Sequence, residues 1–146
     1  MKYYFDTSSL VKIYHREEGT DTVLKIYKGH DDIIISELSK IEFISTIYRK
    51  YREHEISNET VTAVVQKFEN DMMSRYDEVL KFSSLVIDEA WNLICSLSAK
   101  HSLKTQDSIQ FAFYKIYCET DTVFVCSDDK FIKIIELEGV NALSVR

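Results

Sequence analysis

The chain has 146 residues, 45% of them hydrophobic, which is enough for the core of one ordinary domain. It has no proline, only three glycines and no repeat or linker, so we expect a single domain over residues 1–146. The net charge of −6 argues against a protein that holds nucleic acid by bulk electrostatic attraction, although it leaves open a nuclease whose acidic residues surround a metal ion.

Cysteine and histidine usage points to a reducing compartment and away from zinc. Cys95, Cys118 and Cys126 are widely spaced and odd in number, so neither a disulfide framework nor a zinc knuckle is expected. The four histidines lack the spacing of zinc ligands. No signal-peptide pattern and no run near the roughly 18 apolar residues of a membrane span is present. We therefore expect a soluble, cytoplasmic protein.

The chain opens with an aromatic run that favours a β-strand over residues 3–5, followed by Asp6 and three hydroxyl residues. Apolar residues at helical spacing then predict one helix over 8–16 and a second over 20–27, which Gly29 ends. In open α/β sheets ligands bind beyond the carboxyl ends of the strands. An acid directly after the first strand therefore marks that edge as a candidate site.

The middle of the chain predicts a buried strand and two long helices. The β-branched run at 32–35 is typical of a parallel strand covered on both faces, and a helix follows from Ser36. The predicted apolar face of this helix comprises Leu38, Ile41, Ile44, Ser45, Tyr48 and Tyr51. The next helix starts at Asn58 and Glu59 and ends near Met73 or Ser74. Its predicted buried side comprises Val61, Val64, Val65 and Phe68.

A short extended piece over 79–82 precedes a helix that runs from Ser83 or Ser84 to about His101. The apolar residues predicted for its buried face are Ile87, Ala90, Trp91, Ile94, Cys95 and Leu97. A further helix opens at Thr105 or Asp107. Its predicted apolar face comprises Ile109, Ala112, Phe113 and Ile116.

The last part repeats the opening pattern of strand, acid and helix. A strand over 122–126 stops at Ser127, Asp128 and Asp129, and a short helix follows over 130–137. Gly139 is a suitable helix terminator, and 140–143 makes a closing strand. Strands that alternate with helices throughout predict a three-layer α/β/α sandwich with a parallel central sheet.

Four acids fall where such a sheet would bring them together. Asp6 and Asp128 each follow a strand, while Glu42 and Asp107 sit in early turns of helices. Taken singly, helix capping explains such acids well, and Gln110 three residues after Asp107 resembles a capping box. Taken together, like charges about 4 Å apart repel by about 4 kcal/mol at an effective dielectric near 20, so a cluster needs a cation. Hard oxygen donors suit Mg²⁺ or Mn²⁺.

Four ordered motifs resemble those of the PIN-domain ribonucleases, and most of all the VapC toxins of prokaryotic toxin-antitoxin pairs. The motifs are D-T-S-S-L-V-K from Asp6, S-E-L-S-K-I-E-F from Ser36, L-K-T-Q-D-S-I-Q-F-A from Leu103 and F-V-C-S-D-D-K-F from Phe124. The resemblance covers essentially the whole chain and implies a PIN-like fold.

The resemblance also implies that the acidic pocket that binds the divalent metal consists of Asp6, Glu42, Asp107 and Asp128. Glu37 competes with Glu42, which is preferred because it precedes a phenylalanine inside the helix. Asp129 competes with Asp128, which is preferred because it follows the strand after one spacer. Cys126 departs from the threonine of many relatives; Ser127 is a candidate to replace its hydrogen bonding.

The implied activity is metal-dependent cleavage of single-stranded RNA to products with a 5′ phosphate. The implied partners are a second copy of the chain and an antitoxin that lays a helix in a groove. Early-helix residues suit either that groove or the core; these are Leu10, Ile13, Tyr14 and Tyr27. Among cations near the expected mouth we favour Lys104 for RNA contact and a solubility role for Lys12 and Lys40. The basic group Arg49, Lys50 and Arg52 sits late in a helix, where cations suit the dipole, and is not assigned to RNA.

Two other functions stay open on sequence alone. A catalytically silent PIN-like domain would serve only as a binding module, and metal-dependent cleavage separates it from the enzyme. A receiver-like Mg²⁺-binding signalling domain would need an acid pair at the end of the first strand and an aspartate after a middle strand, and the chain lacks both. A D-x-D phosphatase fails because Ser8 stands two residues after Asp6.

Overall fold

The computed structural model describes residues 1–146 and contains one five-stranded parallel sheet. The strand order is β3-β2-β1-β4-β5, so the first strand lies in the middle. The strands are β1 (Lys2–Phe5), β2 (Asp32–Ser36), β3 (Glu78–Leu80), β4 (Val123–Cys126) and β5 (Ala142–Ser144). In register, Tyr4 of β1 lies beside Ile34 of β2 and Phe124 of β4. All strand pairs are parallel, as the alternating pattern predicts.

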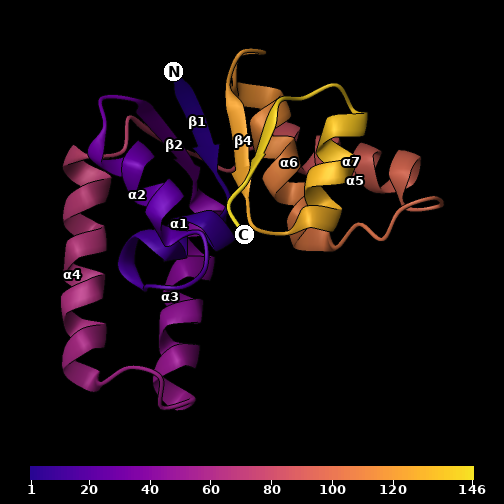
Figure 1. Ribbon diagram of the computed structural model, residues 1–146. Coiled ribbons are helices and arrows are strands. Elements are labelled where there is room, and N and C mark those ends of the chain that lie inside the picture. The colour runs from indigo at the N-terminus through magenta and orange to yellow at the C-terminus, as the bar shows by residue number, and fades with distance from the viewer.

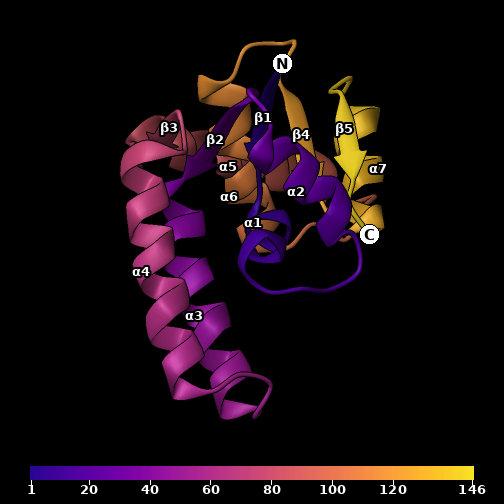
Figure 2. The same ribbon diagram turned by 60° about the vertical axis from the view of Figure 1, so that its left-hand side comes forward.

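Seven helices cover the two faces of the sheet (Figure 1). They are α1 (Thr7–Tyr14), α2 (Thr20–Lys28), α3 (Glu37–Arg52), α4 (Asn58–Ser74), α5 (Ser84–Leu97), α6 (Thr105–Tyr117) and α7 (Asp129–Leu137). Helices α1 to α4 pack on one face, while α5, α6 and α7 pack on the other. Figure 2 shows that α3 and α4 continue side by side beyond the sheet as a long arm. This arrangement confirms the three-layer α/β/α sandwich.

Two apolar clusters follow from the alternation of side chains along the strands. Tyr4, Ile34 and Phe124 point to the α5–α7 side, where they join a cluster of buried residues that is rich in aromatic rings. Phe5 and Val125 point to the opposite side and join the cluster under α1 to α4. The central strands are therefore buried on both faces, as their uninterrupted apolar runs indicated.

Short polar side chains start most of the helices as N-caps. Asp6, Ser36, Ser57 and Asp128 each accept a hydrogen bond from a backbone N–H of the first helical turn. At the other end, Gly29 caps α2, and Gly139 takes a φ of +81° directly after α7. These residues place the two strand-acid-helix junctions where the sequence predicted them.

The predicted buried face of α3 is mostly wrong, since only Leu38 and Ile44 of its six residues pack against the core, and they do so partly. The helix buries Ser39, Phe43, Ile47 and Lys50 instead. Ile41, Tyr48 and Tyr51 are 67%, 48% and 41% exposed. The helix is rotated because the Phe43 ring stacks on Phe68 of α4, with ring centroids 4.1 Å apart, and small Ser39 packs at the end of the sheet.

The predicted buried face of α5 is also partly wrong. Val86, Ala90 and Leu93 are buried, whereas Ile87 and Trp91 are 53% and 71% exposed. Cys95 is exposed as well. The small Ala90 lets α5 pack closely along α6, and this contact turns the larger residues outward. The helix ends at Leu97 rather than near His101. In α4, Val61 and Phe68 are buried, while Val64 and Val65 are only partly so.

None of the helices combines the length and apolar character that crossing a membrane requires.

Candidate active site

Asp6 lies at the junction of β1 and α1 and is only 7% exposed. Its Oδ1 accepts hydrogen bonds from the backbone N of Ser9 and from the hydroxyls of Ser8 and Ser9, at 2.7 to 2.9 Å. Burial raises the pKa of this carboxyl, while those hydrogen bonds and one with Cys126 oppose the rise. Asp6 is therefore a capping residue and, at the same time, a buried acid at the carboxyl edge of the central strand.

Glu42 projects from the second turn of α3 towards the same edge. Its Oε1 accepts hydrogen bonds from Thr7 Oγ1 at 2.9 Å and from Gln110 Nε2 at 3.1 Å. Glu37, the alternative, is engaged elsewhere, because its Oε1 accepts from the backbone N of Phe82 at 2.6 Å. Glu42 lines the cavity with the other acids, and Glu37 does not.

Gln110 of α6 fixes Glu42 and was not singled out as a site residue by the sequence. Its side-chain oxygen accepts from the buried hydroxyl of Tyr4 at 2.5 Å, and its amide nitrogen donates to Ser39 at 2.9 Å as well as to Glu42. The side chain therefore reaches across the sheet edge instead of forming the capping box suggested for Asp107. An amide with both ends bonded holds the carboxylate of Glu42 in one orientation.

Asp107 lies in the first turn of α6 and accepts no hydrogen bond from the protein. Capping does not explain this acid, because Lys104 is the N-cap residue and its side chain makes no cap bond. Burial raises the pKa of Asp107 to about 6; Lys104 opposes the rise, while Asp128, Asp6 and Glu42 add to it. The three other acids are thus close enough to act on this one group.

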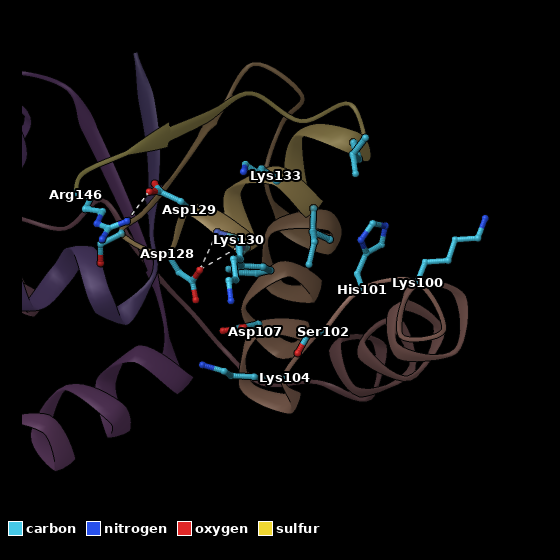
Figure 3. Close-up of a pocket in the computed structure, with 14 residues that line it drawn as sticks. Lys100, His101, Ser102, Lys104, Asp107, Asp128, Asp129, Lys130, Lys133 and Arg146 are labelled. Carbon is cyan, nitrogen blue, oxygen red and sulfur yellow. Dashed lines mark hydrogen bonds and ion pairs between the residues drawn. The ribbon is translucent and has the colours of Figure 1, made fainter.

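The two aspartates that follow β4, Asp128 and Asp129, have different hydrogen-bond partners. Asp128 Oδ1 caps α7 by accepting from the backbone N of Lys130 and Phe131 at 2.9 and 3.2 Å, and its carboxylate faces Asp107 (Figure 3). Asp129 instead accepts from Ser144 Oγ at 2.7 Å and pairs with Arg146 at 3.1 Å. These bonds hold the pKa of Asp129 below its usual value.

Cys126 is fully buried in the core beside this edge. Burial raises the pKa of its thiol, so it stays protonated, and its sulfur accepts from the backbone N of Asp128 at 3.2 Å. The hydroxyl that hydrogen-bonds at this edge comes from Ser8 and not from Ser127, the expected candidate. Ser8 Oγ donates to Asp6 and accepts from the backbone N of Ser127 at 3.1 Å. Ser8 therefore ties the ends of β1 and β4 together.

Two adjoining cavities open at this edge. One, of about 410 Å³, is lined by Asp6, Glu42 and Asp107, and the other, of about 830 Å³, by Asp107 and Asp128. No histidine or cysteine lines the first, and no three acidic, histidine or cysteine side chains anywhere stand ready to hold a metal ion. The oxygen donors nevertheless fit Mg²⁺, which commonly binds through one or two carboxylates and keeps several waters.

The basic residues are arranged differently from the expectation. Lys12 has no solubility role at the surface: it is 5% exposed, donates to the carbonyl oxygen of Glu18 and pairs with Glu17 at 3.2 Å. Lys104 lines both cavities. Lys40 lies in a separate cavity with Glu37.

The basic group late in α3 also departs from its expected role. Arg49 and Lys50 line the smaller acidic cavity, and Lys50 is buried and pairs with Glu17 and Glu55. The helix dipole alone therefore does not account for them. Arg49 forms no ion pair and is a cation of the site that the sequence did not indicate.

The family model of the PIN domain matches residues 3–137 of the chain. The chain belongs to the PIN-domain family. No curated protein matches it in sequence. Solved structures share the fold of this PIN domain at low identity, and 30 chains match.

Three of these structures illustrate the likeness. The VapBC2 complex of Rickettsia felis bound to a DNA fragment from its promoter is 16% identical, covers 99% of this chain and 98% of that chain, and has a TM-score of 0.69. FitAcB of Neisseria gonorrhoeae is 11% identical over 98% and 97%, with a TM-score of 0.72. VapC20 of Mycobacterium tuberculosis, a sarcin-ricin loop cleaving toxin, is 12% identical over 91% and 95%, with a TM-score of 0.69. At such identities they show that this PIN domain shares their fold.

Proposed function

We propose that this PIN domain is a Mg²⁺- or Mn²⁺-dependent endoribonuclease that cleaves single-stranded RNA in the cytoplasm as the toxin of a toxin-antitoxin pair. The observation that carries the proposal is that carboxylates from distant segments line two adjoining cavities at one sheet edge: Asp6, Glu42 and Asp107 line the smaller, and Asp107 and Asp128 line the larger. Similar carboxylates that repel one another at a cavity are stabilised by a divalent cation.

The four carboxylates differ in how many protein hydrogen bonds they accept. Asp107 accepts none, whereas both oxygens of Asp6 accept from Ser8 and one also from Ser9. We assign Asp107 and Asp6, which line the same cavity, as the most direct metal ligands. Glu42 and Asp128 each accept two protein hydrogen bonds on one oxygen and keep the other oxygen for orienting water. A bound Mg²⁺ or Mn²⁺ would polarise the phosphodiester and lower the pKa of a bound water.

Lys104 and Arg49 supply the positive charge that an RNA phosphate needs at this site. Both line the cavity of Asp6 and Asp107, and neither is in an ion pair. Their role is to hold the phosphate near the acids, which would otherwise repel it.

The proposed partners are an antitoxin protein and a second copy of this chain. Among the structural neighbours are VapBC complexes, and one is described as a toxin-antitoxin complex from Klebsiella pneumoniae. Leu10 is fully buried and the hydroxyls of Tyr14 and Tyr27 bind Asp71, so these residues serve the fold more than an open groove. The exposed Ile87 and Trp91 of α5 give a face that suits the second copy.

Cleavage of a mixed single-stranded RNA by the purified chain tests the activity. We expect cleavage with Mn²⁺, none with EDTA, and at least about a hundredfold loss in the variants Asp6→Asn and Asp107→Asn. Asp129→Asn is the matched control, because this neighbouring aspartate points to Arg146 instead of Asp107. Binding of RNA and metal without cleavage would favour the catalytically silent binding module.

A further inference from the structure

The larger of the two cavities is a groove with basic walls. One wall is the loop between α5 and α6, with Lys100, His101 and Lys104, and the other is α7, with Lys130 and Lys133. In Figure 3 Lys104 and Lys130 lie on either side of Asp107, while Lys100 and His101 extend the groove away from the acids. On α7 the two lysines are three residues apart and therefore share one helix face.

The groove carries more positive than negative side chains, because four lysines and Arg146 line it against three aspartates, Asp107, Asp128 and Asp129. None of its four lysines forms an ion pair, whereas Arg146, which also lines it, pairs with Asp129 at 3.1 Å. Four unpaired lysines in one groove of a chain with a net charge of −6 make a local positive potential on an acidic molecule.

The groove is continuous with the acidic site. Asp107 and Lys104 line both cavities, so a chain lying in the groove would lead directly to the carboxylates. The apolar side chains at its floor are mostly covered: Phe131 and Ile134 are 2% and 5% exposed, and only Leu137 is open. A groove with positive walls and a single exposed apolar side chain, Leu137, fits a phosphate backbone better than a peptide, which binds through several apolar anchors.

We propose that this groove, the Lys100–Lys104 loop facing α7, binds the phosphodiester backbone of single-stranded RNA and delivers it to Asp107. That the RNA is delivered to Asp107 rests on the proposed ribonuclease function. That the groove binds a phosphate backbone rests on its unpaired lysines. An acidic polypeptide is the competing occupant, and the scarcity of exposed apolar side chains in the groove favours RNA over it.

Binding of a fluorescein-labelled uridine dodecamer in EDTA tests the groove without any cleavage. The variant Lys130→Gln with Lys133→Gln removes two exposed charges from α7. We expect it to raise the Kd by about tenfold and to lower the slope of log Kd against log salt by about 1.4, since each contact to a single strand contributes about 0.7.

The matched control is Lys25→Gln with Lys28→Gln. These lysines are also exposed, unpaired and three residues apart on a helix, but they lie on α2 and line neither cavity. The control changes the net charge equally. An equal change of Kd in both variants, or no change in either, would overturn the proposal that this groove binds RNA.

Cleavage with Mn²⁺ separates the groove from the proposed function. We expect the α7 variant to raise KM about tenfold and to change kcat by less than about threefold. Wild-type chain that binds RNA through these lysines but never cleaves it would refute the ribonuclease and keep the groove. Cleavage with an unchanged KM would refute the groove and keep the ribonuclease. Lysine-dependent binding of an oligoglutamate, with no such dependence for RNA, would assign the groove to a protein partner and overturn the proposal.

Discussion

Replacing Asp107 with asparagine should make the metal-free protein more stable at neutral pH. The folded-state pKa of Asp107 is about 6, against 3.8 for an ordinary aspartate, because the carboxylate is buried beside three other acids. Between these two values the folded chain holds a proton that the unfolded chain has released, so stability falls as the pH rises. Above about pH 6 the full penalty is present, and asparagine removes it.

The size of the effect follows from the shift. A pKa difference of about two units corresponds to about 3 kcal/mol of differential interaction. Asp107 is partly open to solvent, which screens its charge, so we expect a net gain of about 1 to 2 kcal/mol. The substitution by asparagine removes no stabilising hydrogen bond, because Asp107 accepts none from the protein and does not cap α6.

Urea unfolding of the metal-free protein between pH 8 and pH 5 measures this gain. The stability difference between Asp107→Asn and wild type should be largest at pH 7 to 8 and shrink as the pH falls below 6. Asp129→Asn should show the opposite sign: the pKa of Asp129 is lowered by Ser144 and Arg146, so its charge stabilises the fold at neutral pH and loses that effect on acidification. The clustering of charge at this edge would be refuted if Asp107→Asn were less stable than wild type at pH 8. It would also be refuted if the difference in unfolding free energy between the two proteins did not change with pH.

Three further outcomes test the site and the assembly. Mn²⁺ at about 100 times its dissociation constant should stabilise wild type by about 2.7 kcal/mol, and that gain should shrink in Asp107→Asn and below pH 6, which thermal unfolding with titrated metal would show. Gln110→Leu should lose about 3 kcal/mol in urea unfolding, because it strands the buried hydroxyl of Tyr4, whereas Gln66→Leu on the exposed face of α4 should change stability by less than about 0.5 kcal/mol. Trp91→Glu should convert a dimer to a monomer in light scattering after gel filtration, and an unchanged mass would remove α5 from the interface.

The sheet and the strand-acid-helix junctions could be predicted from sequence because local rules decide them. Uninterrupted β-branched and aromatic runs have few alternatives to a strand buried on both faces. The acids that end the first and fourth strands, Asp6 and Asp128, are also favourable N-caps, so strand end, helix start and site position coincide in one residue.

The supporting residues of the site could not be predicted in the same way. Gln110 and Ser8 act through partners that lie 68 to 119 positions away in the chain, such as Glu42 and the backbone of Ser127. Arg49 reaches the acidic cavity only because α3 turns that side of its last turns toward α1. No spacing rule within one segment contains this information, since it depends on the rotation of each helix about its own axis.

The two misjudged helices show what sets that rotation. α3 and α5 carry more large apolar residues than one face can hold, so periodicity admits more than one buried side. Close packing decides which side of each helix is buried. On α3, Phe43 packs against the ring of Phe68, and on α5 the small Ala90 permits the close approach of α6. This packing leaves Ile41 on α3 and Trp91 on α5 exposed to solvent. A partner that covered these two side chains would bury apolar surface, so we expect protein contacts on these two helix faces.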